Sequence, residues 1–391
     1  MNHDIGVRRK ILHIIHGFSP GGVETWLLAT VKYLHQHPEL NLKFDFLLTG
    51  GVPGIFDEEI KMHGSKIFYF RYSNSSLRSF RNAFRQVLKN NDYIAVHDHQ
   101  DFISGWHFLL GGSYLPAVRI AHLHNPYNFV HNYVVNPIRW ISFNAGRKLM
   151  AHYATKITGT SDAVMDEYGY DKGVFNRKRT SPAYCGFDTK KFNFNSRSKQ
   201  ELCNQLNWDV SANIALFVGR IGLQPYDTAA NQKNPEFAFE VAKQLIASHQ
   251  QWNFLFVGYK GETGARMEAE MIREKLDSRI KFLDIRHDIP DIMSAADVLI
   301  FPSLWEGLGM VAVEAQCSGL NVVMTNTVPQ EAIVCSDLVT IKTVDEGPGA
   351  WVNTITTLSL NGNRDKYADK LRQSPFSIEN SVDRMIALYE S

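Results

Sequence analysis

The sequence has little of several features that would mark particular classes of protein. Its 391 residues include only four cysteines, none in a Cys-x-x-Cys pair, so neither a disulfide framework nor a structural zinc site is indicated. The 41 lysines and arginines nearly balance the 40 aspartates and glutamates, which leaves a net charge of +1 and no global field for nucleic acid. No apolar run is long enough to span a bilayer, and the first apolar run, broken by His13 and His16, is not a typical export signal. We therefore expect a cytoplasmic protein that binds a small molecule, or holds a larger one locally.

What the sequence does contain is a steady alternation of short apolar runs with amphipathic stretches, which is typical of parallel β-α-β units. Two such series are separated by residues 177–192, a stretch that contains Pro182 and Gly186 and shows little periodicity. The sequence predicts an α/β protein with two doubly wound domains, residues 1–185 and 186–376, facing across a cleft, and a C-terminal helix within 377–391. Strands are expected at 11–15, 43–48, 67–70, 93–96, 117–121 and 156–160, and again at 213–218, 253–257, 280–283, 298–301 and 321–324.

The most informative segment is 299–323, which reads as a strand, a glycine-containing turn, a short helix, a glycine stop and another strand. Its glycines allow backbone N–H groups to approach a ligand at the helix N-terminus, where the helix dipole favours an anion. Two carboxylates, Glu306 and Glu314, stand eight positions apart in the same segment. Carboxylates accept well from sugar hydroxyls. The segment therefore predicts an anion site with a sugar contact at each end, while taken singly each glutamate reads equally well as an ordinary helix residue.

This segment strongly resembles the E-x7-E region of the retaining, GT-B-fold nucleotide-sugar glycosyltransferases of family four. The resemblance implies that Glu306 lies by the donor sugar and its phosphate, together with the amides of Gly307, Leu308, Gly309 and Met310. It also implies that Glu314 accepts from the ribose hydroxyls. Four other parts of the chain resemble the family, so the likeness covers most of the sequence.

The N-terminal strand-turn-helix places Gly21 and Gly22 at the start of a helix, similar to the family's glycine turn by the pyrophosphate. Glu24 in the same turn is expected to cap or charge the helix and has no catalytic role. The segment from Leu216 resembles the region whose arginine and lysine clamp the donor diphosphate, which Arg220 and Lys233 match. A metal-free transferase needs such cations for its leaving group. An insertion at 223–232 departs from the family and is expected to order on donor binding.

Histidines occur in two alternating pairs, His97 with His99 and His122 with His124. Because no cysteine or carboxylate joins them at zinc spacing, we expect no metal. A histidine in this region of the family reaches the donor sugar, and His124 is the best match, with His122 as the alternative; either could instead be a satisfied core residue. The segment around Gly186, Asp188 and Phe192 resembles the family's interdomain turn, and the last helix of that fold crosses back to the first domain.

These features predict a retaining, metal-independent glycosyltransferase of the hexosyltransferase type. Its donor is a nucleoside diphosphate sugar, with UDP favoured by frequency in the family, and its acceptor a saccharide or lipid-linked saccharide. The bacterial relatives commonly build surface polysaccharide. The resemblance implies Arg220, Lys233, Glu306 and His124 as catalytic residues and no cofactor. The alternatives are a GT-B-like nucleotide-sugar epimerase and a non-catalytic nucleotide-sugar-binding subunit.

The segment 137–153 combines apolar residues such as Trp140 with the cations Arg139, Arg147 and Lys148. Such a segment could lie at the inner face of a membrane, beside a lipid-linked acceptor. A helix packed on the first domain is the interpretation that we favour, because three cations bind anionic lipid only weakly.

Overall fold

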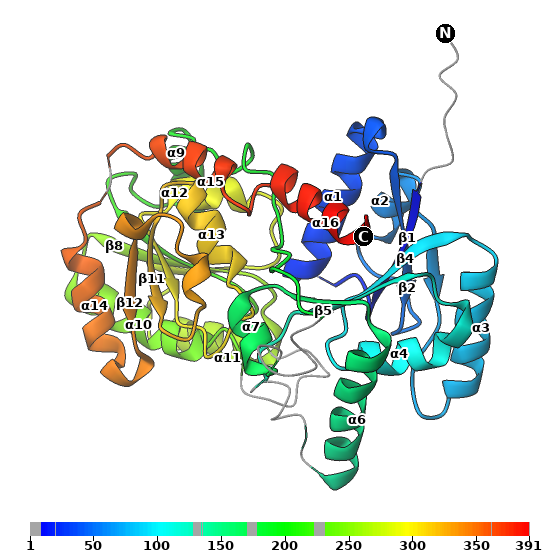
Figure 1. Ribbon diagram of the computed structural model, residues 1–391. Coiled ribbons are helices and arrows are strands. Elements are labelled where there is room, and N and C mark those ends of the chain that lie inside the picture. The colour runs from blue at the N-terminus through cyan, green and yellow to red at the C-terminus, as the bar shows by residue number, and fades with distance from the viewer. Residues whose placement is uncertain are drawn as a thin grey trace. The chain divides into compact units, whose positions relative to one another are not determined.

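The chain forms two compact units in the computed structural model (Figure 1). The structure describes residues 9–19, 21–127, 134, 136–169, 178–222, 231–360 and 362–390. The first unit comprises Met1–Phe187 and Ile378–Ser391, and the second comprises Asp188–Ser377. The boundaries predicted from the sequence lie after residues 185 and 376.

The first unit is built around a six-stranded parallel sheet in the order β3-β2-β1-β4-β5-β6. This is the strand order of a doubly wound dinucleotide-binding fold, in which β1 and β4 lie at the point where the order reverses. Its strands are β1 (Arg9–Ile15), β2 (Leu42–Leu48), β3 (Ile67–Tyr69), β4 (Tyr93–Asp98), β5 (Val118–Leu123) and β6 (Lys156–Gly159). Its helices are α1 (Gly22–Gln36), α2 (Asp57–Met62), α3 (Leu77–Lys89), α4 (Ile103–Gly111), α6 (Pro137–Tyr153), α7 (Asp162–Glu167) and α16 (Ile378–Tyr389).

The second unit repeats this topology with the order β12-β11-β10-β7-β8-β9. Its strands are β7 (Asn213–Val218), β8 (Trp252–Val257), β9 (Ile280–Leu283), β10 (Val298–Phe301), β11 (Asn321–Thr325) and β12 (Val339–Lys342). Its helices are α9 (Ser198–Leu206), α10 (Pro235–Ser248), α11 (Gly261–Arg273), α12 (Ile289–Ala295), α13 (Met310–Cys317), α14 (Gly347–Thr357) and α15 (Lys366–Gln373). The predicted class, α/β with two doubly wound domains, is confirmed. Strand β12 was not predicted, because it is an edge strand without a fully buried residue and so lacks a continuous apolar run.

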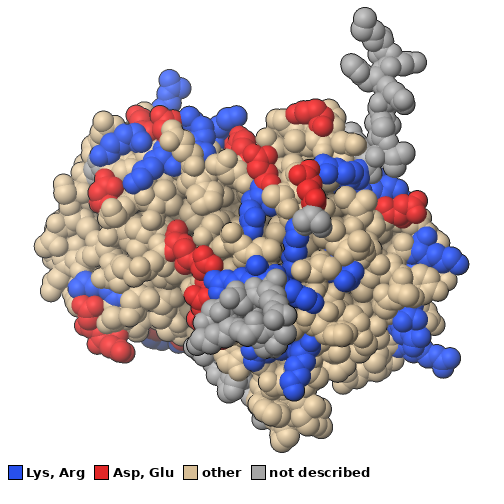
Figure 2. All heavy atoms as spheres, viewed as in Figure 1, with Lys and Arg blue, Asp and Glu red and all other residues tan. Residues whose placement is uncertain are grey.

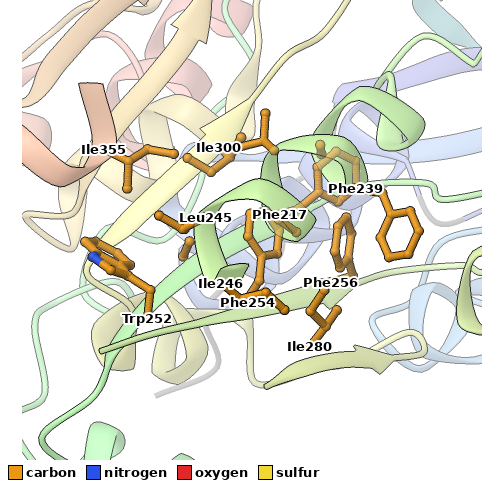
Figure 3. Close-up of a cluster of buried hydrophobic side chains, with 14 of the residues drawn as sticks. Phe217, Phe239, Leu245, Ile246, Trp252, Phe254, Phe256, Ile280, Ile300 and Ile355 are labelled. Carbon is orange, nitrogen blue, oxygen red and sulfur yellow. The ribbon is translucent and has the colours of Figure 1, made fainter. Parts of the chain in front are cut away.

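An aromatic-rich core fixes the strands of the second unit (Figure 3). Phe254, Phe256 and Phe282 come from β8 and β9, and the rings of Phe256 and Phe282 stack with centroids 4.7 Å apart. Helix α10 covers them with Phe239 and Leu245. Because both sides of a parallel sheet are covered, the carboxyl ends of the strands are held in fixed positions, and these ends carry the candidate site.

The last helix, α16, packs on the first unit, as the fold implies. The hydroxyl of Ser381 accepts a hydrogen bond from the indole of Trp26 in α1 (2.9 Å) and donates one to the carbonyl of Tyr184 (2.8 Å). Lys156, at the start of β6, donates to the carbonyl of Leu388 (2.7 Å). The C-terminal residue of the helix, Tyr389, is buried among the histidines of the sheet.

Helix α6 packs closely on α4 through small residues and leaves an apolar face exposed. A Cβ added to Gly105 would lie 2.1 Å from the carbonyl oxygen of Gly146, so the two backbones touch at glycine. On the other face, Ile138, Trp140 and Ile141 are exposed. Among the described residues, no helix combines the length and the apolar character needed to cross a bilayer. Basic and acidic side chains are interspersed on the face shown in Figure 2.

Candidate functional site

The turn between β10 and α13 has a backbone conformation that only glycine adopts easily. Gly309, the residue before α13, has φ +94°. A Cβ at this position would lie 2.9 Å from Cγ1 of Val328 and 3.2 Å from Cε1 of Phe301. The carbonyl of Ser303 in the same turn accepts hydrogen bonds from the hydroxyls of Thr325 and Thr327, each at 2.6 Å. The turn is therefore held in one shape at the end of the strand.

Glu306 lies in this turn and forms an ion pair with Lys233. The distance from Lys233 Nζ to Glu306 Oε1 is 2.6 Å, and the two side chains are 17% and 6% exposed. The other carboxylate oxygen accepts from Gln232 Nε2 at 3.3 Å, and the same nitrogen donates to the carbonyl of Trp305 at 2.9 Å. Lys233 Nζ also lies 4.9 Å from the centre of the Phe301 ring, within the range of a cation–π interaction. The pair is thus largely screened from solvent and held on several sides.

Arg220 reaches the same place from the end of β7. Its Nη2 lies 3.4 Å from Oε1 of Gln232. The backbone is compact here, because a Cβ on Gly258 would lie 2.0 Å from the carbonyl oxygen of Gly219 and one on Gly219 would lie 3.1 Å from Cγ of Lys233. The structure therefore brings three predicted residues together, Arg220, Lys233 and Glu306, with Gln232 between them.

Gln232 was not predicted as a site residue. It falls in the insertion at 223–232, and a lone glutamine carries no sequence signal. Residues 223–230 lie outside the described residues, and so does the prediction that the insertion orders on donor binding.

Glu314, on α13, is half-buried. Burial raises the pKa of its carboxyl group to about 8, and the positive charge of Lys233 acts in the opposite direction. A hydroxyl that donates to this group favours its ionised form and lowers the pKa again. Gly307, Leu308 and Gly309 lead into the first turn of α13, which begins at Met310, and the backbone N–H of Ala312 in this turn donates to the carbonyl of Gly309 at 2.9 Å. The side chain of Leu308 is buried in the unit.

At the start of α1 the two predicted glycines differ in what surrounds them. A Cβ on Gly21, the N-cap residue, would collide with the carboxylate of Glu24, which turns back over the helix start. Gly22 has no such neighbour within 4 Å among the described atoms. A side chain at Gly21 would therefore displace the Glu24 carboxylate from its place over the helix start, whereas the glycine at position 22 leaves the helix start open.

His124 follows directly after β5, whereas His122 lies within that strand. The backbone N–H of His124 donates to Asp101 Oδ1 at 2.7 Å. Burial lowers the pKa of His124 to about 3, and it lowers that of His122 as well, so both rings are neutral. Burial also raises the pKa of Asp101 to about 6, although hydrogen bonds from Asn125 and His124 act against it.

The histidines of the two predicted pairs lie together, and a fifth, His13 of β1, joins them. Two groups of three have ring nitrogens within 4.8 Å of one another, His13 with His97 and His99, and His99 with His122 and His124. His13 was missed, because it is the only histidine of its strand and so belongs to no alternating pair.

The family models that match this chain, and the two relatives given below, are described as glycosyltransferases. Residues 198–373 match the family described as "Glycosyl transferases group 1", and residues 20–191 match "Glycosyltransferase Family 4". The chain is 25% identical to the putative glycosyltransferase EpsF of Bacillus subtilis (98% of this chain, 96% of that protein). It is 23% identical to CapH of Staphylococcus aureus, a capsular polysaccharide biosynthesis glycosyltransferase (98% and 99%). The crystal structure of Anabaena Alr3699/HepE in complex with UDP-glucose has the same fold, with a TM-score of 0.75, 19% identity and coverage of 97% of this chain and 98% of that one.

Proposed function

We propose a retaining, metal-independent hexosyltransferase activity for this chain, a glycosyltransferase whose residues 198–373 match the group 1 model and whose residues 20–191 match the Glycosyltransferase Family 4 model. Its donor is a UDP-sugar, and its acceptor is a hydroxyl of a saccharide or lipid-linked saccharide. UDP-glucose bound to HepE supports the choice of donor, and the role of CapH in capsular polysaccharide supports a role in surface polysaccharide.

The observation that carries this proposal is the contact between Lys233 and Glu306 (2.6 Å) at the start of α13. A lysine suited to a diphosphate and a glutamate suited to a sugar hydroxyl meet at one point, beside Arg220. A diphosphate placed against the helix N-terminus would draw Lys233 towards it and free Glu306 for the sugar. Glu314 lies further along α13, where it accepts from ribose hydroxyls.

The chemistry follows from this charge distribution. The acceptor oxygen forms a bond to the anomeric carbon as the bond from that carbon to the β-phosphate oxygen breaks. The negative charge that develops on the leaving UDP is stabilised by Arg220, Lys233 and the helix amides, so no metal is needed. The acceptor proton passes to the leaving phosphate on the same face of the sugar, which retains the anomeric configuration. In the first unit, His124 is the residue proposed to accept a hydrogen bond from a sugar hydroxyl.

We place this reaction in the cytoplasm, at the inner face of the membrane where the acceptor is lipid-linked. All four cysteines are free thiols, which suits a reducing compartment. The exposed residues Ile138, Trp140 and Ile141 of α6 supply an apolar face for weak contact with the membrane surface.

The test begins with a panel of UDP-, GDP- and ADP-sugars in a thermal-shift assay, because a true donor raises the unfolding temperature by mass action. Transfer is then measured with the best donor and its product examined by NMR for anomeric configuration, with and without EDTA. Glu306→Gln should lower the transfer rate by about 10²-fold or more while sparing most of the nucleotide affinity. Glu270→Gln is the matched control, since it removes an ion pair to Lys243 elsewhere in the same unit.

Each competing function has its own result. An inverted product would refute retention, a covalent glycosyl-enzyme would refute the same-face substitution, and loss of rate in EDTA would refute metal independence. Conversion of the donor to an epimer without any acceptor would indicate an epimerase. Donor binding without turnover under any condition would indicate a binding subunit.

A further inference from the structure

The side-chain amide of Gln232 lies between Glu306 and Arg220 in the candidate site. Its Nε2 donates to Glu306 Oε2 at 3.3 Å and to the carbonyl of Trp305 at 2.9 Å, and its Oε1 accepts from Arg220 Nη2 at 3.4 Å. An amide nitrogen only donates hydrogen bonds and an amide oxygen only accepts them. These neighbours fix which way the amide is turned, because the opposite orientation would place its oxygen against two acceptors and its nitrogen against the guanidinium.

The main chain holds Gln232 in place independently of its amide. The carbonyl of Gln232 accepts from the backbone N–H of Leu304, in the turn after β10, at 2.8 Å. The neighbouring Asn231 donates from Nδ2 to the carbonyl of Ile221, just after β7, at 3.1 Å, and it accepts at Oδ1 from the backbone N–H of Lys233 at 3.3 Å. The segment is therefore attached to the ends of two neighbouring strands, and removal of the Gln232 amide leaves these contacts intact.

The two carboxylate oxygens of Glu306 have partners of different kinds. Oε2 faces the neutral amide of Gln232, and Oε1 is 2.6 Å from the ammonium of Lys233. A diphosphate attracts the ammonium more strongly than one carboxylate does, because it carries more negative charge and the lysine stem is flexible. A neutral amide with an anchored backbone feels little of this attraction and keeps Oε2. When an anionic ligand takes Lys233, Oε1 is therefore the oxygen that can accept from the ligand.

We propose that Gln232 is a positioning residue, whose amide holds Oε2 of Glu306 so that Oε1 meets a ligand hydroxyl once Lys233 has turned to the diphosphate. The terminal torsion of a glutamate is broad, so a carboxylate that has lost its lysine turns easily unless a second donor fixes it. Fixing it in advance reduces the cost of reaching the productive geometry. The identity of the ligand as a sugar nucleotide rests on the proposed function, whereas the hold on Oε2 does not depend on it.

A structural glutamine in the same unit has different partners. Gln316 of α13 is fully buried, and its amide bonds to backbone groups. These groups are the carbonyls of Ala312 and Ala332 and the N–H groups of Val334 and Cys335. The amide of Gln232 also bonds to two charged side chains, Glu306 and Arg220. A structural glutamine would support the turn whatever residue stood at position 306, whereas a positioning residue acts only through the carboxylate there.

The first experiment is a double-mutant cycle of Gln232→Met and Glu306→Ala, measured in the transfer rate at saturating donor and in the affinity for UDP. Methionine keeps the length of glutamine and removes its amide. We expect Gln232→Met to lower kcat about 10-fold when Glu306 is present and less than about 2-fold when it is absent. UDP lacks the transferred sugar, so its dissociation constant should change less than about 3-fold. Gln205→Met is the matched control, because Gln205 is exposed on α9, where its amide lies by Arg286 at 3.5 Å, and both quantities should stay unchanged.

The second experiment needs no activity and detects the hydrogen bond itself by NMR of the full ¹⁵N-labelled chain. The side-chain amide signal of Gln232 is identified by its loss in Gln232→Met or Gln232→Glu. We expect one of its two protons to exchange with solvent about 10-fold more slowly in the wild type than in Glu306→Ala. This difference should persist when UDP saturates the protein, because the amide keeps Oε2 after Lys233 has moved.

Several outcomes would overturn the proposal. A wild-type kcat in Gln232→Met, or a loss of the same size with and without Glu306, would show that the amide does not act through the carboxylate. A UDP affinity that falls as much as kcat would place its role at the nucleotide. An amide proton that Glu306 does not protect, or that loses protection when UDP binds, would show that Oε2 is not held.

The two experiments separate this proposal from the proposed function. If Gln232→Met does not fold, or if the rate of Glu306→Ala is too low to measure, the exchange of the amide protons decides alone. Absence of transfer together with the expected protection would refute the proposed function and leave the positioning of Glu306 standing. Transfer without that protection would refute the positioning of Glu306 alone.

Discussion

Replacing Glu314 by glutamine should stabilise the protein, and more so as the pH rises. The pKa of this carboxyl group is raised by burial from 4.5 to about 8 in the folded state. Below pH 4.5 the group is protonated in both the folded and the unfolded chain, so it costs no stability. Between pH 4.5 and 8 the unfolded chain releases its proton while the folded chain keeps it, so the free energy of unfolding falls as the pH rises. Above pH 8 the loss is complete. Glutamine keeps the shape and carries no charge, so the variant escapes this loss.

The size of the effect follows from the same interval. From 4.5 to about 8, at about 1.4 kcal/mol per pH unit, the loss is bounded at about 5 kcal/mol. Glu314 is only half-buried and Lys233 favours its charge, so solvent and this cation screen much of the cost, and we expect about 1–2 kcal/mol. For a unit of this size, each kcal/mol shifts the midpoint of thermal unfolding by about 2–4 °C.

The assay is thermal unfolding of both proteins at pH 5, 6.5 and 8. The midpoint of Glu314→Gln minus that of the wild type should grow by about 2–8 °C from pH 5 to pH 8. Glu270→Gln is the control, because hydrogen bonding to Lys243 lowers the pKa of Glu270 below 4.5. This carboxyl group is ionised in both the folded and the unfolded chain from pH 5 to pH 8, so the difference between the midpoints of this variant and the wild type should not change with pH over that range. A difference for Glu314→Gln that stays constant or shrinks with rising pH would refute the reasoning, since the carboxyl group would then be ionised in the folded protein without penalty.

Two further substitutions test the framework around the site by chemical denaturation. Gly309→Ala forces a side chain into φ +94° and into contact with its neighbours, and it should cost about 1–3 kcal/mol of stability. Gly349→Ala in α14 is the control, because its new side chain meets only an ordinary contact and should be neutral or stabilising. Equal effects of the two substitutions would contradict the strain at Gly309. Arg364→Met should cost about 3 kcal/mol or more of stability, because this buried guanidinium donates to four carbonyls. Arg372 is exposed, and Arg372→Met should change stability by less than about 0.5 kcal/mol. A mild effect at Arg364 would show that the carbonyls find other donors.

The strands were the most predictable part of the molecule. Strands β7 and β10 begin and end at the predicted residues, because parallel strands buried on both faces appear as continuous apolar runs. The edge strand β9 also has the predicted bounds, which its apolar residues on either side of Lys281 mark. The β-α alternation was enough to give the class of each unit. What it could not give was β12, whose residues are at most half-buried, since an edge strand needs no apolar run.

The site was predictable where its function depends on backbone conformation. Glu306, Gly309 and Glu314 lie in a single turn and the helix that follows it, so their spacing along the sequence is enough to identify them. Gln232 and Tyr389, in contrast, meet their partners only because the fold brings distant segments together. Gln232 meets Glu306 only because β7 and β10 are neighbours in the sheet, and Tyr389 meets His97 and His13 only because the last helix returns to the first unit. A residue type that serves equally well in many environments carries no signal until these neighbours are known. The same reasoning applies to the histidines, since alternation along one strand shows that two rings share a face but not that a third strand supplies the ring between them. The position of β1 between β2 and β4 therefore places His13 in one group with His97 and His99.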